Sequence, residues 1–258
     1  MKVDLNSDLG EGAGHDDEIL SLVSSANIAC GFHAGNPSGI FNSIRAAKEK
    51  GVAVGAHPSL DDRKNFGRTE MQVGGAEVYA LVAYQVGAFQ ALCTAAEVKM
   101  NHVKPHGALY NMAVRDRELS DAIANGVLAV DKGAILFAPA GTELFKAAHE
   151  LELQTGSEVF ADRNYNSDGT LVSRTRPDAL LRDPGEAAER VVRMLKEGKI
   201  RAIDGSDVAV RPETICLHGD TPGAVEFARM LRARLEREGI LITAPRRITN
   251  PECRSTKE

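Results

Sequence analysis

Two histidines and a lysine stand at alternate positions in the segment MNHVKPHGALY, residues 100–110. A proline disfavours helical backbone at the residue before it, so Pro105 favours an extended conformation at Lys104. Side chains of an extended segment alternate between two faces, which places His102, Lys104 and His106 on the same face. Burying two imidazoles and an ammonium together costs free energy, so their burial on one face indicates that they have a function. We therefore predict a strand that leads into an active site, in preference to a basic strand on the surface.

Further side chains that can do chemistry follow other short apolar segments. Five of the seven histidines stand at such positions, and so do several acids. In folds built from parallel strands, the carboxyl ends of the strands meet on one face of the molecule. The sequence therefore predicts one pocket lined by Asp8, Glu11, His33, His57, His102, Lys104, His106, Asp162, His218 and Asp220.

Three of these residues have specific predicted roles. Asp8 is a candidate general base, with capping of the adjacent glycine-rich turn as the alternative. Lys104 is expected to have a pKa lowered by its histidine neighbours and to hold an anion or a developing oxyanion. Its alternative is a salt bridge to Asp8 or Glu11. His218 is expected to be oriented by Asp220, which could equally cap the helix that follows.

Substrate binding is assigned to a second set of side chains. Arg68, in the turn at residues 66–68, offers a guanidinium that can clamp a carboxylate, the alternative being a solvated loop arginine. Glu11, His33 and Asp162 are assigned to substrate binding with it.

A divalent metal is an open possibility at the same pocket, with Asp8, His57 and His106 as candidate ligands. Histidine and aspartate at strand ends match common zinc or manganese ligation. On a strand, His102 and His106 would lie roughly 13 Å apart, too far to share one ion without a bend. The glycine-rich turn at residues 10–14 resembles a phosphate-binding turn only loosely, and the chain contains no P-loop or dinucleotide-binding motif.

Short apolar segments alternate with amphipathic ones along the chain. Strands are expected at 3–8, 26–33, 52–57, 100–110, 134–139, 155–160, 214–218 and 240–243, and helices at 16–25, 37–51, 75–97, 116–130, 142–151, 183–198 and 221–235. This alternation predicts a parallel sheet, and its length suits a single-domain TIM-like (β/α) barrel over residues 1–245, closed or incomplete, with about seven strands. A doubly wound open sheet is the competing architecture. Residues 246–258 are expected to form a loose tail.

Composition excludes several classes of function. The chain has 258 residues, a net charge of -5 and 43% hydrophobic residues. It shows no basic stretch interleaved with aromatics, so no nucleic-acid partner is expected. Its apolar runs are short and no leader peptide is evident, so we expect no membrane partner and a cytoplasmic location. The four cysteines are scattered, which favours reduced thiols.

Several longer blocks, in this order, carry a resemblance to a known family. They are DLNSDLGEG (4–12), SANIACGFHAG (25–35), GAHPS (55–59), FGR (66–68), HVKPHGALYN (102–111), EVFADRNY (158–165) and CLHGD (216–220). With these blocks the chain resembles the LamB/YcsF family from Asp4 to about Pro245, and the tail beyond does not match the family pattern.

The resemblance implies a barrel related to TIM-like glycosidases and deacetylases. It also implies a 5-oxoprolinase that works with two further subunits, B and C, and opens 5-oxoproline to L-glutamate with ATP hydrolysis. The sequence lacks an ATP motif, so we expect ATP to be used largely on the partners. In the expected mechanism Asp8 or His57 is the base and His218 protonates the leaving nitrogen, while Lys104, His102 and His106 hold the oxyanion or phosphoryl group.

Two other classes of function remain open. One is a stand-alone metal-dependent hydrolase, such as a deacetylase acting on carbohydrate or a lactam hydrolase. The other is a non-catalytic scaffold subunit.

Overall fold

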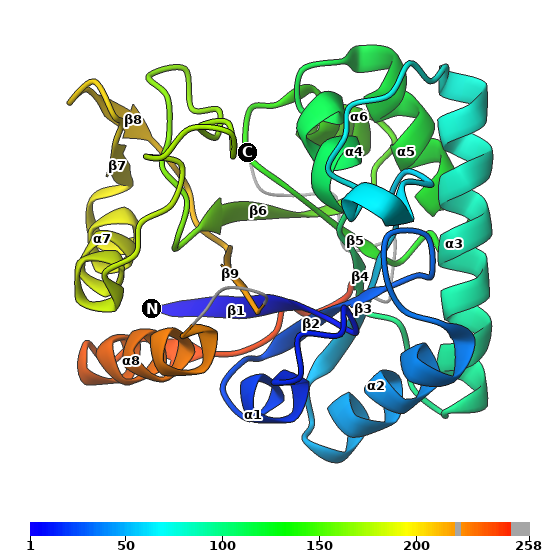
Figure 1. The fold of residues 1–258 in the computed structure, drawn as a ribbon, viewed down its shortest axis with the longest axis horizontal. Helices are drawn as coiled ribbons and strands as arrows, with labels where there is room; N and C mark the ends of the chain where they lie inside the picture. The colour runs from blue at the N-terminus through cyan, green and yellow to red at the C-terminus, as the bar shows by residue number, and fades with distance from the viewer. Residues whose placement is uncertain (220–222, 249–258) are drawn as a thin grey trace.

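Seven parallel strands form a closed barrel in the computed structural model, which describes residues 1–219 and 223–248. The strands are β1 (Lys2–Leu9), β2 (Ser25–Ala29), β3 (Ala53–His57), β4 (His102–Val103), β5 (Ile135–Ala138), β6 (Gln154–Phe160) and β9 (Thr214–His218). Each strand pairs with the next, and β9 closes the ring by pairing with both β6 and β1 (Figure 1). The TIM-like barrel is confirmed, and the open doubly wound sheet is wrong.

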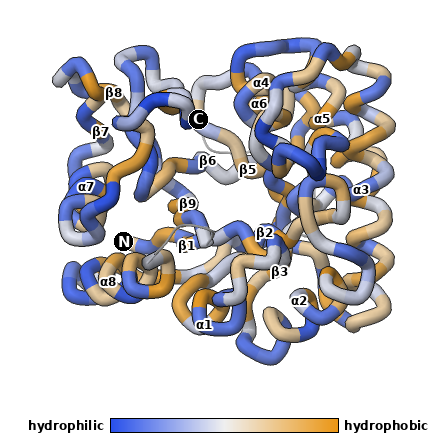
Figure 2. Tube along the Cα trace, viewed as in Figure 1, coloured by the Kyte–Doolittle hydropathy of each residue, from blue (hydrophilic) through white to orange (hydrophobic). Residues whose placement is uncertain are grey.

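Eight helices cover the outside of the barrel in the described part of the chain (Figure 1). They are α1 (Asp16–Leu20), α2 (Pro37–Glu49), α3 (Gly75–Ala95), α4 (Gly107–Ala113), α5 (Arg117–Val130), α6 (Glu143–Glu150), α7 (Pro184–Glu197) and α8 (Ala224–Arg237), with a short 3-10 helix, η1 (Arg63–Asn65). Their starts follow sequence signals: Asn36 caps α2 and Asp183 caps α7, each followed by a proline in the first turn. Hydrophobic and hydrophilic residues follow one another along α8 (Figure 2), and its buried residues recur at helical spacing: Ala224, Ala228, Leu231 and Leu235.

The segment around Pro105 is not one long strand. Strand β4 contains only His102 and Val103, and a helix, α4, begins at Gly107. Gly107 has a φ of +55°, and a Cβ there would lie 2.4 Å from the carbonyl oxygen of Gly67. The short apolar run after His106 suits a helix as well as a strand, so its periodicity could not decide between them.

Two other boundaries also differ from the expectation. Strand β2 ends at Ala29, so His33 lies in the loop that follows instead of on the strand. The polar segment 199–209 forms an antiparallel hairpin of β7 (Lys199–Arg201) and β8 (Asp207–Ala209), which the sequence did not predict.

Helix α3 is the single described helix that is long and apolar enough to cross a membrane by length and composition. It packs against α5, α2 and β3 on the outside of the barrel. Its buried apolar residues recur at helical spacing, as expected for a helix with one side on a protein core: Val78, Val82, Val86, Phe89 and Cys93.

The segment assigned to a loose tail begins in contact with the barrel. Strand β10 (Leu241–Ile242) pairs with the first residues of β1, and the chain then runs beneath the barrel. Arg247 is paired with Asp131 at 2.6 Å, and the carbonyl of Arg246 accepts a hydrogen bond from Gln154 at 2.7 Å. Residues 249–258 lie outside the described residues.

The lower interior of the barrel holds a buried carboxyl group. The side chain of Asp4 accepts hydrogen bonds from the hydroxyls of Ser24 (2.7 Å), Ser25 (2.7 Å) and Thr214 (2.6 Å). Burial nevertheless raises its pKa from 3.8 to about 6, because water is excluded from around the charge.

We expect Asp4→Asn to change how stability depends on pH. A raised pKa means that Asp4 contributes stability below pH 3.8 and loses it as the pH rises through about 6. The free energy of unfolding of the natural protein, minus that of the variant, should therefore fall by about 3 kcal/mol across this interval. Denaturant titrations of both proteins over this pH range measure it, and parallel pH profiles would contradict the raised pKa.

Candidate active site

Residues from distant parts of the chain meet in one pocket at the carboxyl ends of the strands. The pocket is lined by Asp8, Glu11, His57, Arg68, Lys104, Pro105, His106, Gly107, Tyr110, Asn111, Phe160, Arg163, Leu171, Arg174 and His218. The sequence-predicted residues Asp8, Glu11, His57, Arg68, Lys104, His106 and His218 are therefore brought together. His33 and Asp162 stand directly behind this lining, through contacts described below.

The floor of the pocket is a buried ionic cluster around Lys104. Its ammonium lies 2.9 Å from Asp8 Oδ1, 3.1 Å from Glu158 Oε1 and 2.9 Å from the Sγ of Cys216. Burial alone would lower the pKa of Lys104, but the close contacts with Asp8, Cys216 and Glu158 outweigh burial and raise it well above its usual value. The expected lowering of this pKa is therefore wrong, because carboxylates are closer to the ammonium than the histidines are.

Asp8 is ionised in this arrangement. Burial raises its pKa, but His57 and Lys104 outweigh burial and hold the pKa well below the usual range. Asn27 also donates a hydrogen bond to Asp8 Oδ1 at 2.8 Å. Asp8 therefore presents a carboxylate to the pocket, and the salt bridge considered as an alternative for Lys104 exists.

His102 lies below the pocket and is not part of its lining. Its Nε2 contacts Asn27 Oδ1 at 2.7 Å, and its ring stacks on Phe137 with centroids 4.2 Å apart. Burial, followed by the charge of Lys104, lowers the pKa of His102 to about 3, so the ring is neutral. A neutral donor at this place fixes the orientation of Asn27, which in turn holds Asp8.

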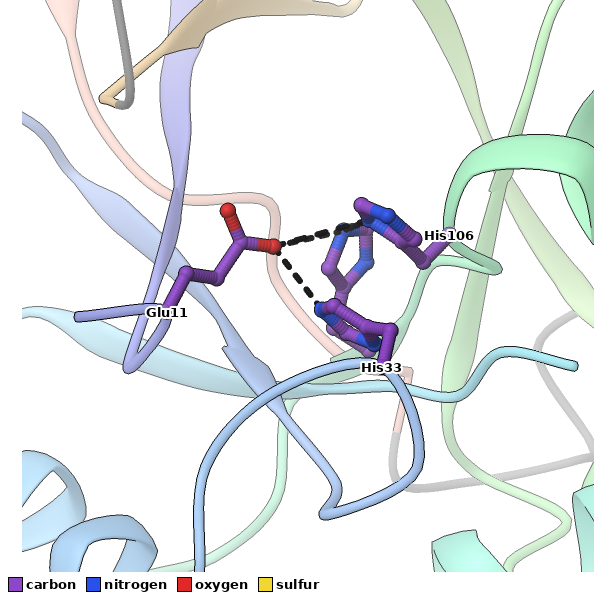
Figure 3. A group of neighbouring side chains, drawn as sticks. Glu11, His33 and His106 are labelled. Carbon is purple, nitrogen blue, oxygen red and sulfur yellow. Dashed lines mark hydrogen bonds and ion pairs between the residues drawn. The ribbon is translucent and has the colours of Figure 1, made fainter. Parts of the chain in front are cut away.

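Three imidazoles and one carboxylate form a second cluster on one wall of the pocket. His106 Nδ1 lies 2.9 Å from His57 Nε2 and 3.5 Å from Glu11 Oε1, and His33 Nε2 lies 2.9 Å from the same oxygen. Figure 3 shows Glu11 pointing at both His33 and His106. The ligand atoms of Glu11, His33, His57 and His106 all lie within 4.8 Å of one another, as do those of Asp8, Cys216 and His218.

The loop after β3 holds this cluster in place. The carbonyl of Phe66 accepts a hydrogen bond from His106 Nε2 at 2.9 Å, while the Phe66 ring packs edge-on against His33 and His106. Phe66 adopts a left-handed conformation with a φ of +58°, which is uncommon for a residue other than glycine. Gly67 has a φ of +64°, and a Cβ there would lie 2.9 Å from the His106 ring. The residues 66–68 therefore position a histidine as well as presenting Arg68.

His218 is oriented by Asp162. Its Nδ1 lies 2.7 Å from Asp162 Oδ2, and the two side chains are nearly buried. Burial raises the pKa of Asp162, but the proximity of His218 outweighs it and lowers the pKa below the usual value. Asp220, expected to have this role, lies outside the described residues.

Arginines occupy the mouth of the pocket. Arg68 lies with its guanidinium 4.8 Å from the Phe66 ring centroid, and Arg163 and Arg174 reach the pocket from the loop after β6. Arg163 is almost fully buried, and its Nη2 donates to the carbonyl of Val172 at 2.6 Å. Burial, together with the neighbouring charge of Arg174, lowers its pKa to about 10. This concentration of positive charge suits an anionic group on a small ligand.

Comparisons with known proteins agree with this architecture. The model of the LamB/YcsF family matches residues 3–250. The chain is 51% identical over 248 residues to the A subunit of 5-oxoprolinase from Bacillus licheniformis, covering 94% of this chain and 98% of that protein. It is 50% identical over 249 residues to the A subunit of 5-oxoprolinase from Bacillus subtilis, with 95% and 97% covered. The crystal structure of a lactam utilization protein from Thermus thermophilus has a TM-score of 0.89 and 49% identity, with 95% of this chain and 100% of that chain covered.

The chain belongs to the LamB/YcsF family. The sequence blocks that carry the family resemblance also contain site residues that the sequence reasoning missed. These are Asn6, Asn27, Tyr110, Glu158, Arg163 and Cys216, to which Arg174 is added from the following loop. Glu158 had a usable signal, because an acid inside an apolar strand is rarely buried without a partner. Tyr110 donates to Glu158 Oε2 at 2.7 Å, from a helix that was not expected.

Lys104→Met should destabilise the protein strongly while leaving the helices and strands able to form. It leaves two carboxylates buried without their cation, which costs about 3–5 kcal/mol in the free energy of unfolding. Adding Glu158→Gln should recover part of the loss, because one of the two charges is removed. Denaturant unfolding measures both effects.

The matched control is Lys146→Met, which removes a lysine paired with Glu143 at 2.8 Å on an exposed helix surface. Its cost should stay within about 1 kcal/mol. A loss for Lys104→Met as small as that of the control would show that the buried cluster does not depend on the ammonium.

Proposed function

We propose that this chain is the A subunit of a 5-oxoprolinase and holds the site at which 5-oxoproline is opened to L-glutamate, together with the B and C subunits and ATP hydrolysis. Two relatives, about half identical over nearly their whole length, are named as the A subunit of 5-oxoprolinase. The observation that carries the proposal is the pocket itself, which is lined by an ionised carboxylate, a fixed ammonium and an oriented imidazole.

The charges in the pocket suit a small lactam that bears a carboxylate. Arg68, Arg163 and Arg174 at the mouth would bind the carboxylate, in the way that guanidinium groups commonly do. The lactam carbonyl would then point inward toward Lys104, whose fixed positive charge stabilises the negative charge that develops on the oxygen. Because the pKa of Lys104 is raised, the lysine acts as a cation and not as a base.

Ring opening needs water to attack the carbonyl carbon and a proton to reach the ring nitrogen. Asp8, being ionised, would align the water and take up its proton as the water attacks. The new C–O bond forms as the C–N bond breaks, and the nitrogen leaves as an amine once it has gained a proton. His218 would donate this proton, with Asp162 holding its ring in position.

ATP enters the proposal through the partner subunits. The sequence has no nucleotide-binding motif, so we place ATP on one of the two partners, B or C. There its hydrolysis would activate the lactam or drive the opening of the lactam ring. A cytoplasmic location belongs to the same proposal, since the reaction consumes ATP.

Asp162→Asn should lower the kcat of ATP-coupled glutamate formation by about 100-fold or more, the usual contribution of a positioned acid–base group. The amide keeps the shape of Asp162 but no longer stabilises the imidazolium of His218. The measurement is glutamate and ADP release by the chain mixed with the B and C subunits.

A matched control lies in the same loop. Asp178→Asn removes a carboxylate paired with the exposed Arg176 at 2.7 Å and should leave turnover unchanged. Full turnover in both Asp162→Asn and Asp8→Asn would favour a scaffold subunit. Turnover by this chain without its partners or ATP would instead favour a stand-alone hydrolase.

Arg68→Leu should raise the KM for 5-oxoproline by about 10-fold or more with a smaller effect on kcat, because a charge-assisted contact to the substrate carboxylate is worth about 1.5–3 kcal/mol. Arg115→Leu, which removes an exposed arginine paired with Glu70, is the charge-matched control. An unchanged KM for the Arg68 variant would remove Arg68 from the carboxylate site.

A further inference from the structure

The protonation of two neighbouring histidines is fixed by main-chain carbonyl groups. His57 Nδ1 lies 2.7 Å from the carbonyl oxygen of Lys104, and His106 Nε2 lies 2.9 Å from that of Phe66. A carbonyl oxygen can only accept a hydrogen bond, so each of these nitrogens carries a hydrogen. In the neutral rings, His57 Nε2 and His106 Nδ1 must therefore carry lone pairs.

These two lone pairs meet inside the protein. His57 Nε2 and His106 Nδ1 lie 2.9 Å apart, a distance at which a positive centre must bind both nitrogens to offset their repulsion. Glu11 Oε1 lies 3.5 Å from His106 Nδ1 and 3.9 Å from His57 Nε2, so a carboxylate converges on the same point. A shared proton would serve the two nitrogens only, whereas a metal ion uses all three atoms.

We propose that His57 Nε2, His106 Nδ1 and Glu11 Oε1 bind one divalent transition-metal ion of the zinc class. Two imidazoles and one carboxylate form a known three-ligand set for catalytic zinc, in which a fourth position stays open for water or substrate. All three residues line the pocket, so the open position faces the space assigned to the substrate. The candidate ligands expected from the sequence are thus kept for His57 and His106, and Glu11 takes the place of Asp8.

His33 supports this site without joining it. Its ring is stacked on the ring of His106, with centroids 3.8 Å apart and planes 2° apart. An imidazole lone pair lies in the plane of its ring, so two stacked rings cannot both point at one ion. His33 Nε2 lies 2.9 Å from Glu11 Oε1, where it donates a hydrogen bond and fixes the carboxylate, as outer partners of metal ligands commonly do.

The other group of potential ligands is already occupied by a cation. The ammonium of Lys104 lies 2.9 Å from both Asp8 Oδ1 and Cys216 Sγ, and it takes the place that an ion would need between them. Asp8 Oδ2 lies 3.4 Å from His57 Nε2. It is therefore a neighbour of the proposed ion and not one of its ligands. The use of the ion in ring opening rests on the proposed function: the ion would lower the pKa of a bound water, and Asp8 would accept a hydrogen bond from it.

Metal binding can be measured without any turnover. The full-length chain is stripped with a chelator and titrated with Co²⁺, followed by visible absorption, and with Zn²⁺, followed by calorimetry. We expect one ion per chain and the absorption bands of cobalt bound by nitrogen and oxygen. His57→Gln, His106→Gln and Glu11→Gln should each weaken binding by more than about 100-fold, since even outer partners of a metal site are worth about 10–100-fold.

His149→Gln is the matched control, because it removes an exposed histidine from helix α6 and should leave binding unchanged. Circular dichroism of each variant separates loss of a ligand from loss of the fold. Absence of saturable binding to the natural chain would overturn the metal site, and so would one-to-one binding that survives all three ligand substitutions.

The same preparations distinguish the metal site from the proposed function. Glutamate formation by the stripped chain, mixed with the B and C subunits in chelator-treated buffer, should fall and return on adding Zn²⁺ or Co²⁺. Full turnover without metal would overturn the metal proposal and leave the oxoprolinase proposal standing. One-to-one metal binding without any oxoproline turnover by the complex would overturn the oxoprolinase proposal and leave the metal site standing.

Discussion

A single buried ammonium is the constraint on which the interior of this barrel depends. Asp8 and Glu158 both contact the Lys104 side chain, and both are almost completely shielded from water. Two carboxyl groups could not be buried side by side there without a cation except at great cost, because removing a charge from water costs several kcal/mol. Through Glu158 the ammonium also fixes Tyr110, and through Asp8 it fixes Asn27. One positive charge therefore orders side chains from strands and a helix that are far apart in the sequence.

Such an interior is possible only because parallel strands place their polar residues at matching heights. Strand β1 turns Asp4, Asn6 and Asp8 inward while Leu5 and Leu9 pack against the helices. The register of the neighbouring strands completes the network, since Asn6 lies beside Cys216 in β9. Small residues make room where rings enter the barrel: a Cβ at Gly55 would lie 2.2 Å from the ring of His102. A polar core of this kind is stable only when nearly every donor and acceptor in it has a partner.

The sequence predicted the structure best where reactive side chains stand at the ends of strands. The alternation of segments predicted the barrel, and the strand-end rule predicted that His57, His106 and His218 would share a pocket. The sequence could not show which side chains touch one another. Lys104, for example, contacts the carboxylate of Glu158, which lies far along the chain in β6. The expected shift in the pKa of Lys104 had the wrong sign for this reason. Loop partners were equally hidden, since Asp162 and His218 are separated by a polar loop, a helix and a hairpin.

The two halves of the site differ in how they are built, and this difference has a functional meaning. The floor comes from strands and is held by short, buried contacts that a substitution cannot change without cost to the fold. The mouth comes from loops, in which Arg163 and Arg174 are held by irregular backbone with the bridges Arg163–Leu180 and Tyr165–Leu171. Loops tolerate sequence change better than strands do. In the proposed function the reaction centre would therefore lie in the fixed part of this pocket, and the choice of substrate would be set mainly by loop residues that can vary without disturbing Lys104.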